Sequence, residues 1–403
     1  MVARMRGAML GRTVAALAIA AGAGLGITVA CGTGDISDLT AGRPDAGGGE
    51  GGGIDSSVCN HATAPERPTT PDAPNTPSLV FAFNAVRFDT DEQDGGLPKP
   101  QGLDLDMTCT CADPKLEPES CVPPDAGVKR LCDGVDGRDN AAGPLISAAS
   151  LAANGVGPAA FQKKIESGNF NVLMTVDGWN GLPDDPAVVV GVLLSSGVEG
   201  SQSDASAPPF PKFDGTDVWT VSPVSVLGGV GLEGTDCRLR PATCIPLKVD
   251  TSAYVRDNTI VAHLDIEIPL ESSLGAFQID YRGATTRAKI VKDGNLYRVT
   301  GEIVGRWPIQ RLLPSLARLP NPAGGGRPLC ATDSGLEIYA FVKRSACEAV
   351  DLAANPTADR TSARCDAISN AITFTATTAT TGTIYQPSGE PSECPDFTDT
   401  CEK

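Results

Sequence analysis

Alternating apolar and polar residues predict strands over most of the chain after Leu79. Segment 79–88 has the aromatic and β-branched density of a strand. Similar patterns recur at 170–176, 187–194, 218–226 and 260–268. Two longer segments, 277–291 and 296–304, flank Asp293-Gly294, a dipeptide typical of tight β-hairpins.

Helices are predicted between and after these strands. A stretch of small residues follows Asp139-Asn140, and a clearer helix covers 158–167, where Pro158 suits the first turn and Gly168 the end. Further helices are predicted from Pro308 onward, at 336–353 and at 362–376. The Thr-rich end of the last segment fits a strand equally well.

Together these elements predict a mainly β protein with accessory helices. Strands spread over ~230 residues indicate one antiparallel sandwich or barrel, and we favour a single antiparallel β-sandwich, of concanavalin or jelly-roll type, plus C-terminal helices. The chain divides into a signal peptide at 1–30, a disordered Gly/Pro-rich tether at 31–78, a disulfide-stapled β-rich domain with helices at 79–385 and a cysteine-containing tail at 386–403.

The beginning of the chain has the order of an export signal. Arg4, Arg6 and Arg12 form a basic region, which an uncharged apolar run at 13–29 follows. The run is too short, and too rich in Ala and Gly, for a membrane-spanning helix. We therefore expect an exported protein with a cleaved leader.

Cys31 comes directly after this segment and is the candidate lipidation site. The residues before it resemble the lipobox of bacterial lipoproteins, with Ala30 in place but with Thr28 where Leu is usual. An ordinary signal followed by a fortuitous cysteine is the alternative. Gly32, where inner-membrane lipoproteins usually carry Asp, indicates the outer membrane or cell surface. The tether that follows has too little apolar surface to offset its ordering entropy, and it would hold the body some tens of ångströms from the bilayer.

Thirteen cysteines occur, and setting Cys31 aside leaves twelve, which in an oxidising compartment predicts up to six disulfides. Cys59 is placed to staple the far end of the tether to the body. Short closures are expected for Cys237–Cys244, Cys347–Cys365 and Cys394–Cys401. The alternative is a zinc site built from Cys109, Cys111, Cys121 and Cys132, which lack the paired C-x-x-C spacing.

The formal net charge is −17, and removal of the three signal-peptide arginines makes it about −20. No run rich in Lys or Arg interrupts this acidic composition. Such a surface repels phosphate backbones, so we expect no nucleic-acid partner.

Acidic residues give the strongest candidate site. Asp133, Asp136, Asp139 and Asn140 lie in a Gly-bent loop, and hard cations such as calcium favour clusters of this kind. The spacing does not follow the EF-hand rule. Upstream, Asp104 and Asp106 alternate with Leu103, Leu105 and Met107, which predicts a half-buried strand with both carboxylates on one face. They would complete a calcium shell if the fold brings them near; capping of a helix by Asp139 or Asn140 is the alternative.

Catalytic constellations are scarce. His61 and His263 are the only histidines, and no G-x-S-x-G motif accompanies them, so we identify no catalytic residue. Asp265 and Glu267 share one face of a predicted strand, where a solvated sheet face explains them best. Trp179 and Trp219 are candidates for stacking on sugar rings, with core packing as the alternative.

Several motifs together resemble a group of predicted lipoproteins from myxobacteria. They are the lipobox-like start, Gly102-Leu103-Asp104-Leu105-Asp106 before clustered cysteines, the stretch 136–140, Trp179-Asn180-Gly181 before Asp184-Asp185, and Cys365-Asp366-Ala367-Ile368-Ser369. The resemblance implies a cell-envelope location and a β-rich body similar to concanavalin-like sandwiches, and it implies no reaction.

We therefore expect a lipoprotein of the cell envelope that acts as a binding or structural module rather than an enzyme. Its partners would be the membrane, through a lipid on Cys31, and a glycan or envelope protein. The alternative is an extracellular carbohydrate-active hydrolase or a lectin-like glycan binder.

Overall fold

The computed structural model describes residues 59–70, 77–90, 97–111, 120–123, 131–152, 157–200, 210–229, 231–269, 278–322, 324–385, 394 and 397–402. The predicted signal peptide, Cys31, the tether up to residue 58 and part of the tail lie outside these residues. Within the described residues, no helix has the length and apolar character needed to cross a membrane.

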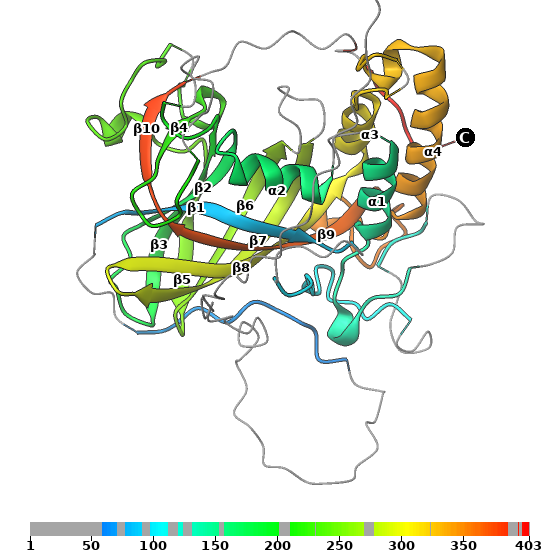
Figure 1. The fold of residues 1–403 in the computed structure, drawn as a ribbon. Coiled ribbons are helices and arrows are strands. Elements are labelled where there is room, and N and C mark those ends of the chain that lie inside the picture. Colours follow the sequence, from blue (N-terminus) through cyan, green and yellow to red (C-terminus); the bar gives the residue numbers. More distant parts are fainter. Residues whose placement is uncertain are drawn as a thin grey trace, which may run out of the picture. The chain divides into compact units, whose positions relative to one another are not determined.

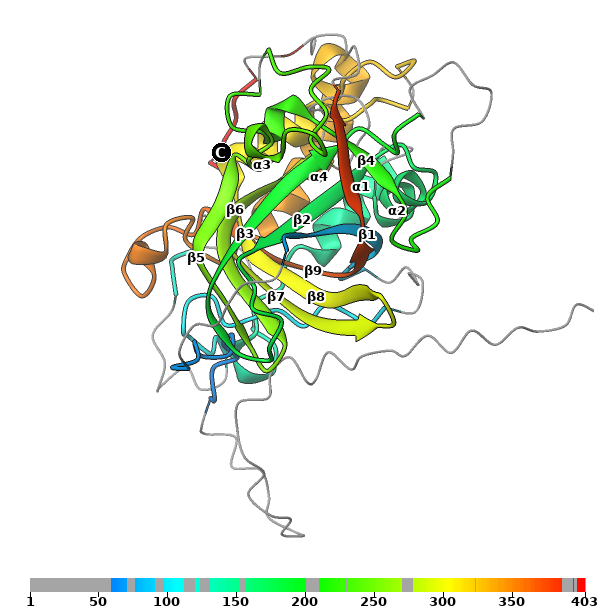
Figure 2. The same cartoon turned by 90° about the vertical axis from the view of Figure 1, so that its left-hand side faces the viewer.

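Eight antiparallel strands form one sheet that closes on itself as a barrel (Figures 1 and 2). Around the barrel they are β1 (Leu79–Phe88), β2 (Asn171–Asp177), β3 (Asp185–Ser195), β5 (Lys248–Arg256), β6 (Thr259–Pro269), β7 (Gln278–Asp293), β8 (Leu296–Pro308) and β9 (Ala367–Thr378). β1 pairs with β2 on one side and with β9 on the other, which closes the sheet. The prediction of a mainly β fold with accessory helices is confirmed, and the sheet takes the closed arrangement rather than that of two separate sheets.

The hairpin predicted at Asp293-Gly294 joins the two longest strands, β7 and β8. Their pairing runs up to Asp293 opposite Leu296, and Gly294 takes a positive φ of 61°, as a tight hairpin turn requires. The apolar pattern does not predict β5, because polar residues at 250–252 interrupt its alternation.

The segment 362–376 forms a strand over most of its length, so the helix expected there is wrong. β9 pairs with β8 from Ala367 opposite Pro308 to Thr377 opposite Arg298, and it pairs with β1 on its other edge. Its β-branched Ile and Thr residues fit this central position in a sheet. The sequence of this segment fits either a helix or a strand. Pairing with β8 and β1 selects the strand, which closes the barrel.

The described part contains four α-helices, α1 (Gly143–Ala152), α2 (Pro158–Glu166), α3 (Ile309–Ala317) and α4 (Asp333–Glu348). α4 starts earlier than predicted because the Thr332 side chain caps it, accepting a hydrogen bond from the Gly335 backbone N–H. Short 3-10 turns occupy Val135–Gly137, Pro223–Ser225, Pro241–Thr243, Leu329–Ala331 and Pro356–Ala358. α1 and α3 both pack against α4 (Figure 1).

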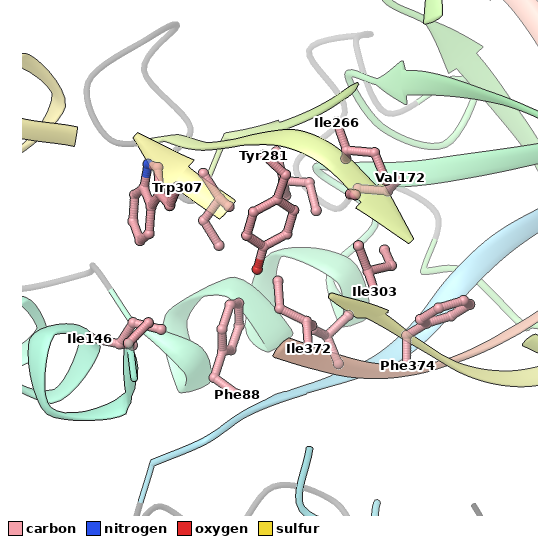
Figure 3. Close-up of a cluster of buried hydrophobic side chains, with 14 of the residues drawn as sticks. Phe88, Ile146, Val172, Ile266, Tyr281, Ile303, Trp307, Ile372 and Phe374 are labelled. Carbon is pink, nitrogen blue, oxygen red and sulfur yellow. The ribbon is translucent and has the colours of Figure 1, made fainter. Parts of the chain in front are cut away.

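Apolar side chains occupy the barrel interior and continue beneath the helices. Figure 3 shows Tyr281, Ile303, Ile372 and Phe374 within this core, with Ile146 of α1 at its edge. The rings of Phe374 and Phe83 stack with their centroids 4.3 Å apart. An eight-stranded barrel has room for its own side chains or for one small ligand, and here buried apolar side chains lie in the interior.

A second, smaller sheet pairs β4 (Val218–Val221) in parallel with β10 (Thr380–Ile384). It covers the outside of the barrel, where Trp219 packs in a cluster with Leu173 of β2. The strand predicted at 218–226 is therefore shorter than expected, because Pro223 starts a 3-10 turn.

Six disulfides pair all twelve cysteines that follow Cys31. They are Cys59–Cys109, Cys111–Cys132, Cys121–Cys365, Cys237–Cys244, Cys330–Cys394 and Cys347–Cys401. Cys237–Cys244 is confirmed, whereas Cys347–Cys365 and Cys394–Cys401 are wrong. Residues 397–402 of the tail contact α4, where Tyr339 Oη donates to Asp399, and both tail cysteines have partners in the body. The zinc alternative is also wrong, since all four of its cysteines form disulfides.

The end of the predicted tether, residues 59–70, lies against the barrel. Arg67 donates to the carbonyls of Pro186 and Ser252, and its guanidinium lies 4.7 Å from the centre of the Tyr254 ring. Tyr254 Oη donates in turn to the carbonyl of Pro65. The folded body therefore includes residues that the sequence assigned to the tether.

Candidate metal centre

The segment that carries Asp104 and Asp106 crosses the outer wall of the barrel. The strand expected at 103–107 is wrong: only Leu103 forms a β-bridge, with Asp139, and the chain then bends at 105–107. Leu103 is buried against Val304 and Ala371. This apolar contact fixes the segment on strands β8 and β9.

The bend brings three carboxylates together. Oxygens of Asp104, Asp106 and Asp139 all lie within 4.8 Å of one another, and these residues are 6%, 4% and 2% exposed. The sequence analysis joined Asp104 and Asp106 to the downstream loop on condition that the fold brings them near, and for Asp139 it does. We call these three residues the acidic centre.

Backbone hydrogen bonds fix the orientation of each carboxylate. The Thr108 N–H donates to Asp104 Oδ1 at 3.1 Å and to Asp106 Oδ1 at 2.8 Å. The Leu105 N–H donates to Asp139 Oδ2 at 2.6 Å. These bonds leave carboxylate acceptor sites unused, because each ionised carboxylate offers about four lone-pair positions.

Arg306 of β8 ties this segment to the barrel. Its guanidinium donates to the Leu105 carbonyl at 2.6 Å and forms two hydrogen bonds with Asp359, at 2.8 and 2.6 Å. Its charge is thus directed to Asp359, away from the three carboxylates of the acidic centre.

Two further carboxylates, Asp133 and Asp351, act on the acidic centre electrostatically. Burial raises the pKa of Asp133 and that of Asp351 to about 7 each, and the charge of Asp106 adds to both shifts. Burial also raises the pKa of Asp106, and it raises the pKa of Asp139 well above the usual range, with Asp106, Asp351 and Asp133 adding repulsion. Five carboxylates therefore share one poorly solvated region.

Little positive charge compensates for this group. His61 Nδ1 lies 2.5 Å from Asp104 Oδ2. Among the described residues, no Lys or Arg forms an ion pair with any of the other four carboxylates. The buried Ser120 Oγ lies beside Asp106, lowers the pKa of that carboxyl and makes no hydrogen bond of normal geometry. Within the part of the chain that the structure describes, a neutral oxygen and several carboxylates thus lie together with His61 as the one paired base.

Three predicted ligands lie outside the acidic centre: Asp133, which acts on it through its charge, and Asp136 and Asn140. The Asp136 carboxylate acts on Arg138, and its backbone carbonyl accepts from the Ala62 N–H. Asn140 uses its side chain structurally, donating to Asp89 and accepting from the Ala371 N–H at 3.0 Å. Neither side chain therefore belongs to the group of carboxylates that lie within 4.8 Å of one another.

Asp351 is the neighbouring carboxylate that the sequence did not reveal. It follows α4, far along the chain from the other acids, and it accepts hydrogen bonds from the Ser369 backbone and hydroxyl at 2.8 and 2.5 Å. No spacing rule links Asp351 to residues 104–139, because the connection depends on how β9 closes the barrel.

A second group of donor atoms adjoins the acidic centre through Asp104. Sulfurs of Cys59 and Cys109, His61 Nδ1 and an Asp104 oxygen all lie within 4.8 Å of one another. Both cysteines are joined in a disulfide.

The remaining candidates have structural surroundings. Trp179 is 4% exposed, packs edge-on against Tyr297 and donates to the Leu182 carbonyl, while Trp219 is fully buried. Neither indole offers a free face to a sugar ring, so core packing explains both. His263 Nδ1 lies 3.1 Å from Thr285 Oγ1.

The two acids of the predicted sheet face lie on β6 and are paired with cations. Asp265 bonds Arg282 at 2.9 Å, and Glu267 lies 3.7 Å from Lys248. These pairs fit the interpretation of a solvated sheet face.

No protein-family model, curated protein or solved structure matches the chain. The disulfides fit an oxidising, exported environment. The fold and the acidic centre define the class: a disulfide-rich, mainly β protein with a buried group of carboxylates on its barrel wall.

Proposed function

We propose that this protein is a calcium-stabilised binding or structural module of the cell envelope. One observation carries the calcium assignment: the convergence of buried oxygens of Asp104, Asp106 and Asp139 within 4.8 Å. Ca²⁺ binds oxygens at about 2.3–2.6 Å, so two ligands on opposite sides of the ion lie roughly 5 Å apart. The spread of the acidic centre matches that size.

The energetics favour the same conclusion. Burying several carboxylates without a counter-charge costs several kcal/mol each, unless they are protonated or bind a cation. Because the pKa values of Asp133 and Asp351 are about 7, protonation and cation binding compete near neutral pH. A divalent ion would offset the burial and the smaller repulsion that raise these pKa values, and Ser120 would supply a neutral oxygen.

The test is thermal unfolding of the purified mature chain with calcium and with a chelator. A ligand at a hundred times its Kd stabilises by ~2.7 kcal/mol, which raises Tm by several degrees. Asp106→Asn should abolish this increase, whereas Asp136→Asn should retain it, since Asp136 is an acid of the same region outside the acidic centre. An unchanged Tm in wild type would refute the calcium assignment.

The envelope location is proposed on separate grounds. Six disulfides support an oxidising compartment, and the lipobox-like sequence before Cys31 and the resemblance to myxobacterial lipoproteins support lipid anchoring at the outer membrane or cell surface. Labelling of cells with a fatty-acid analogue should mark the wild type and not Cys31→Ala. Equal labelling of both would exclude a lipid on Cys31.

A glycan or an envelope protein is the proposed partner class for such a module. The alternative, a carbohydrate-active hydrolase or lectin, loses its stacking residues because Trp179 and Trp219 are buried. A glycan array discriminates between these possibilities, since specific binding would favour the lectin and uniform absence of binding would favour an envelope protein.

A further inference from the structure

We propose that Cys59, Cys109, His61 and Asp104 form a second metal site, for zinc or a similar transition-metal ion, which becomes available when the Cys59–Cys109 disulfide is reduced. The four donor atoms lie within 4.8 Å of one another. The site shares Asp104 with the acidic centre, but it does not depend on calcium binding there.

After reduction the two sulfurs, which the disulfide holds in bonding contact, have to move apart to about 3.8 Å, and the other distances are already close to those of a tetrahedral site. With Zn–S bonds of ~2.3 Å and Zn–N or Zn–O bonds of ~2.0 Å, neighbouring donor atoms are about 3.3–3.8 Å apart. Cys59 Sγ already lies 3.7 Å from His61 Nδ1. His61 Nδ1 and Asp104 Oδ2, now 2.5 Å apart, need to separate by less than an ångström to admit the ion. Two thiolates, an imidazole and a carboxylate are donors that zinc accepts and calcium does not favour.

The donors stay in place without the disulfide, because backbone hydrogen bonds hold the segment that carries them. The Ala62 N–H donates to the Asp136 carbonyl, and the Ala62 carbonyl accepts from the Asp104 N–H, each at 2.8 Å. Further along, Arg67 binds the barrel through the carbonyls of Pro186 and Ser252. Reduction therefore frees two sulfurs without freeing the segment.

The chemistry balances with a dithiol as the reductant. The dithiol gives two electrons and two protons to the Cys59–Cys109 disulfide and becomes a disulfide itself. Binding of a divalent ion to the two resulting thiols then releases both protons. In the oxidised state the sulfurs are bonded to each other and donate poorly, so the redox state controls access to the metal.

Cobalt(II) titration tests the proposal, because thiolate coordination gives cobalt a charge-transfer absorption band. We expect this band in the full mature chain after dithiol treatment and not in the oxidised chain, with alkylation and mass spectrometry showing that Cys59 and Cys109 are reduced. The Cys59→Ser/Cys109→Ser variant, treated identically, controls for all other cysteines. A band of equal strength in that variant would overturn the proposal.

A second variant avoids reductant altogether. Cys59→Ser leaves Cys109 as a free thiol beside His61 and Asp104 while the other five disulfides stay closed. It should bind cobalt through one thiolate, and adding His61→Ala should weaken that binding at least tenfold. If neither reduced wild type nor Cys59→Ser gives a thiolate band, or if His61→Ala leaves the affinity unchanged, the assignment fails.

Matched variants separate this site from the acidic centre. Asp106→Asn should abolish the calcium-dependent rise in Tm and leave the cobalt band intact, whereas His61→Ala should do the reverse. If Asp106→Asn loses both the calcium-dependent rise in Tm and the cobalt band, the two groups of residues are one site, and the proposal of a second metal site is overturned.

Discussion

The stability of the calcium-free protein should fall as the pH rises from about 4 to about 7. In the folded state the pKa values of Asp133 and Asp351 are about 7, against 3.8 for a free Asp side chain. The folded protein therefore holds protons that the unfolded chain has already lost. Their stabilising contribution is complete below pH 4 and disappears as the pH passes through 7.

The magnitude follows from the shift. About three pKa units correspond to roughly 4 kcal/mol for each group, since one unit is 1.36 kcal/mol. Solvent access and the interaction of the two groups reduce this, so a combined loss of several kcal/mol across the window is expected. Calcium bound to the acidic centre should remove most of the loss, because its charge stabilises the ionised forms of the neighbouring Asp133 and Asp351.

Denaturant unfolding at half-unit steps from pH 4.5 to 8, with chelator and with saturating calcium, measures both effects. The calcium-dependent stabilisation should be small at pH 5 and largest above pH 7. Asp351→Asn should flatten the curve recorded in chelator. A stability that stays level or rises with pH in chelator, or a calcium effect equal at pH 5 and pH 7.5, would refute the reasoning.

Three other substitutions probe the surroundings of the acidic centre. Glu302→Gln should destabilise by ~3–5 kcal/mol in denaturant unfolding, because it leaves the fully buried Arg287 charge without its partner at 2.6 Å; a loss below 1 kcal/mol would contradict this. Gly137→Ala should weaken calcium binding in calorimetry, since its Cβ would lie 2.3 Å from an Asp104 oxygen and φ is +72°; wild-type affinity would be the contrary result. Arg67→Ala should expose residues 59–70 to limited proteolysis, and an unchanged cleavage pattern would argue against its anchoring role.

The sequence predicted those elements that depend on residues within a few positions of one another. The hairpin at Asp293-Gly294 and the helix that begins at Pro158 were both correct, because turn chemistry and capping act within a few residues. The segment 362–376 was ambiguous, and β5 was missed. In both cases, pairing with strands distant in sequence decides the conformation.

The acidic centre could be predicted only in part, because only part of it depends on residues close together in the sequence. Alternation with Leu103 and Leu105 placed Asp104 and Asp106 on one side, although the chain bends there instead of forming a strand. The contribution of Asp351 depends on closure of the barrel and could not be predicted from spacing. Disulfide pairing follows the same rule. Cys237–Cys244 closes a short loop and was predicted, whereas the cysteines of the two wrongly predicted pairs bond to partners far away in the sequence.

The acidic centre lies where the leading segment joins the barrel, and this position gives a bound ion a mechanical role. The segment from Cys59 is linked to Cys109 by a disulfide and to Asp104 through His61, and Asp139 comes from the segment that follows the loop closed by Cys111–Cys132. An ion shared by Asp104, Asp106 and Asp139 would cross-link these two loops on the wall formed by β8 and β9. Under the proposed lipid anchor at Cys31, tension along the chain would reach the described residues first at Cys59, which a disulfide joins to Cys109. Calcium bound there would strengthen the attachment of the segment from Cys59 to the barrel. A structural or binding module on a tether would require such an attachment.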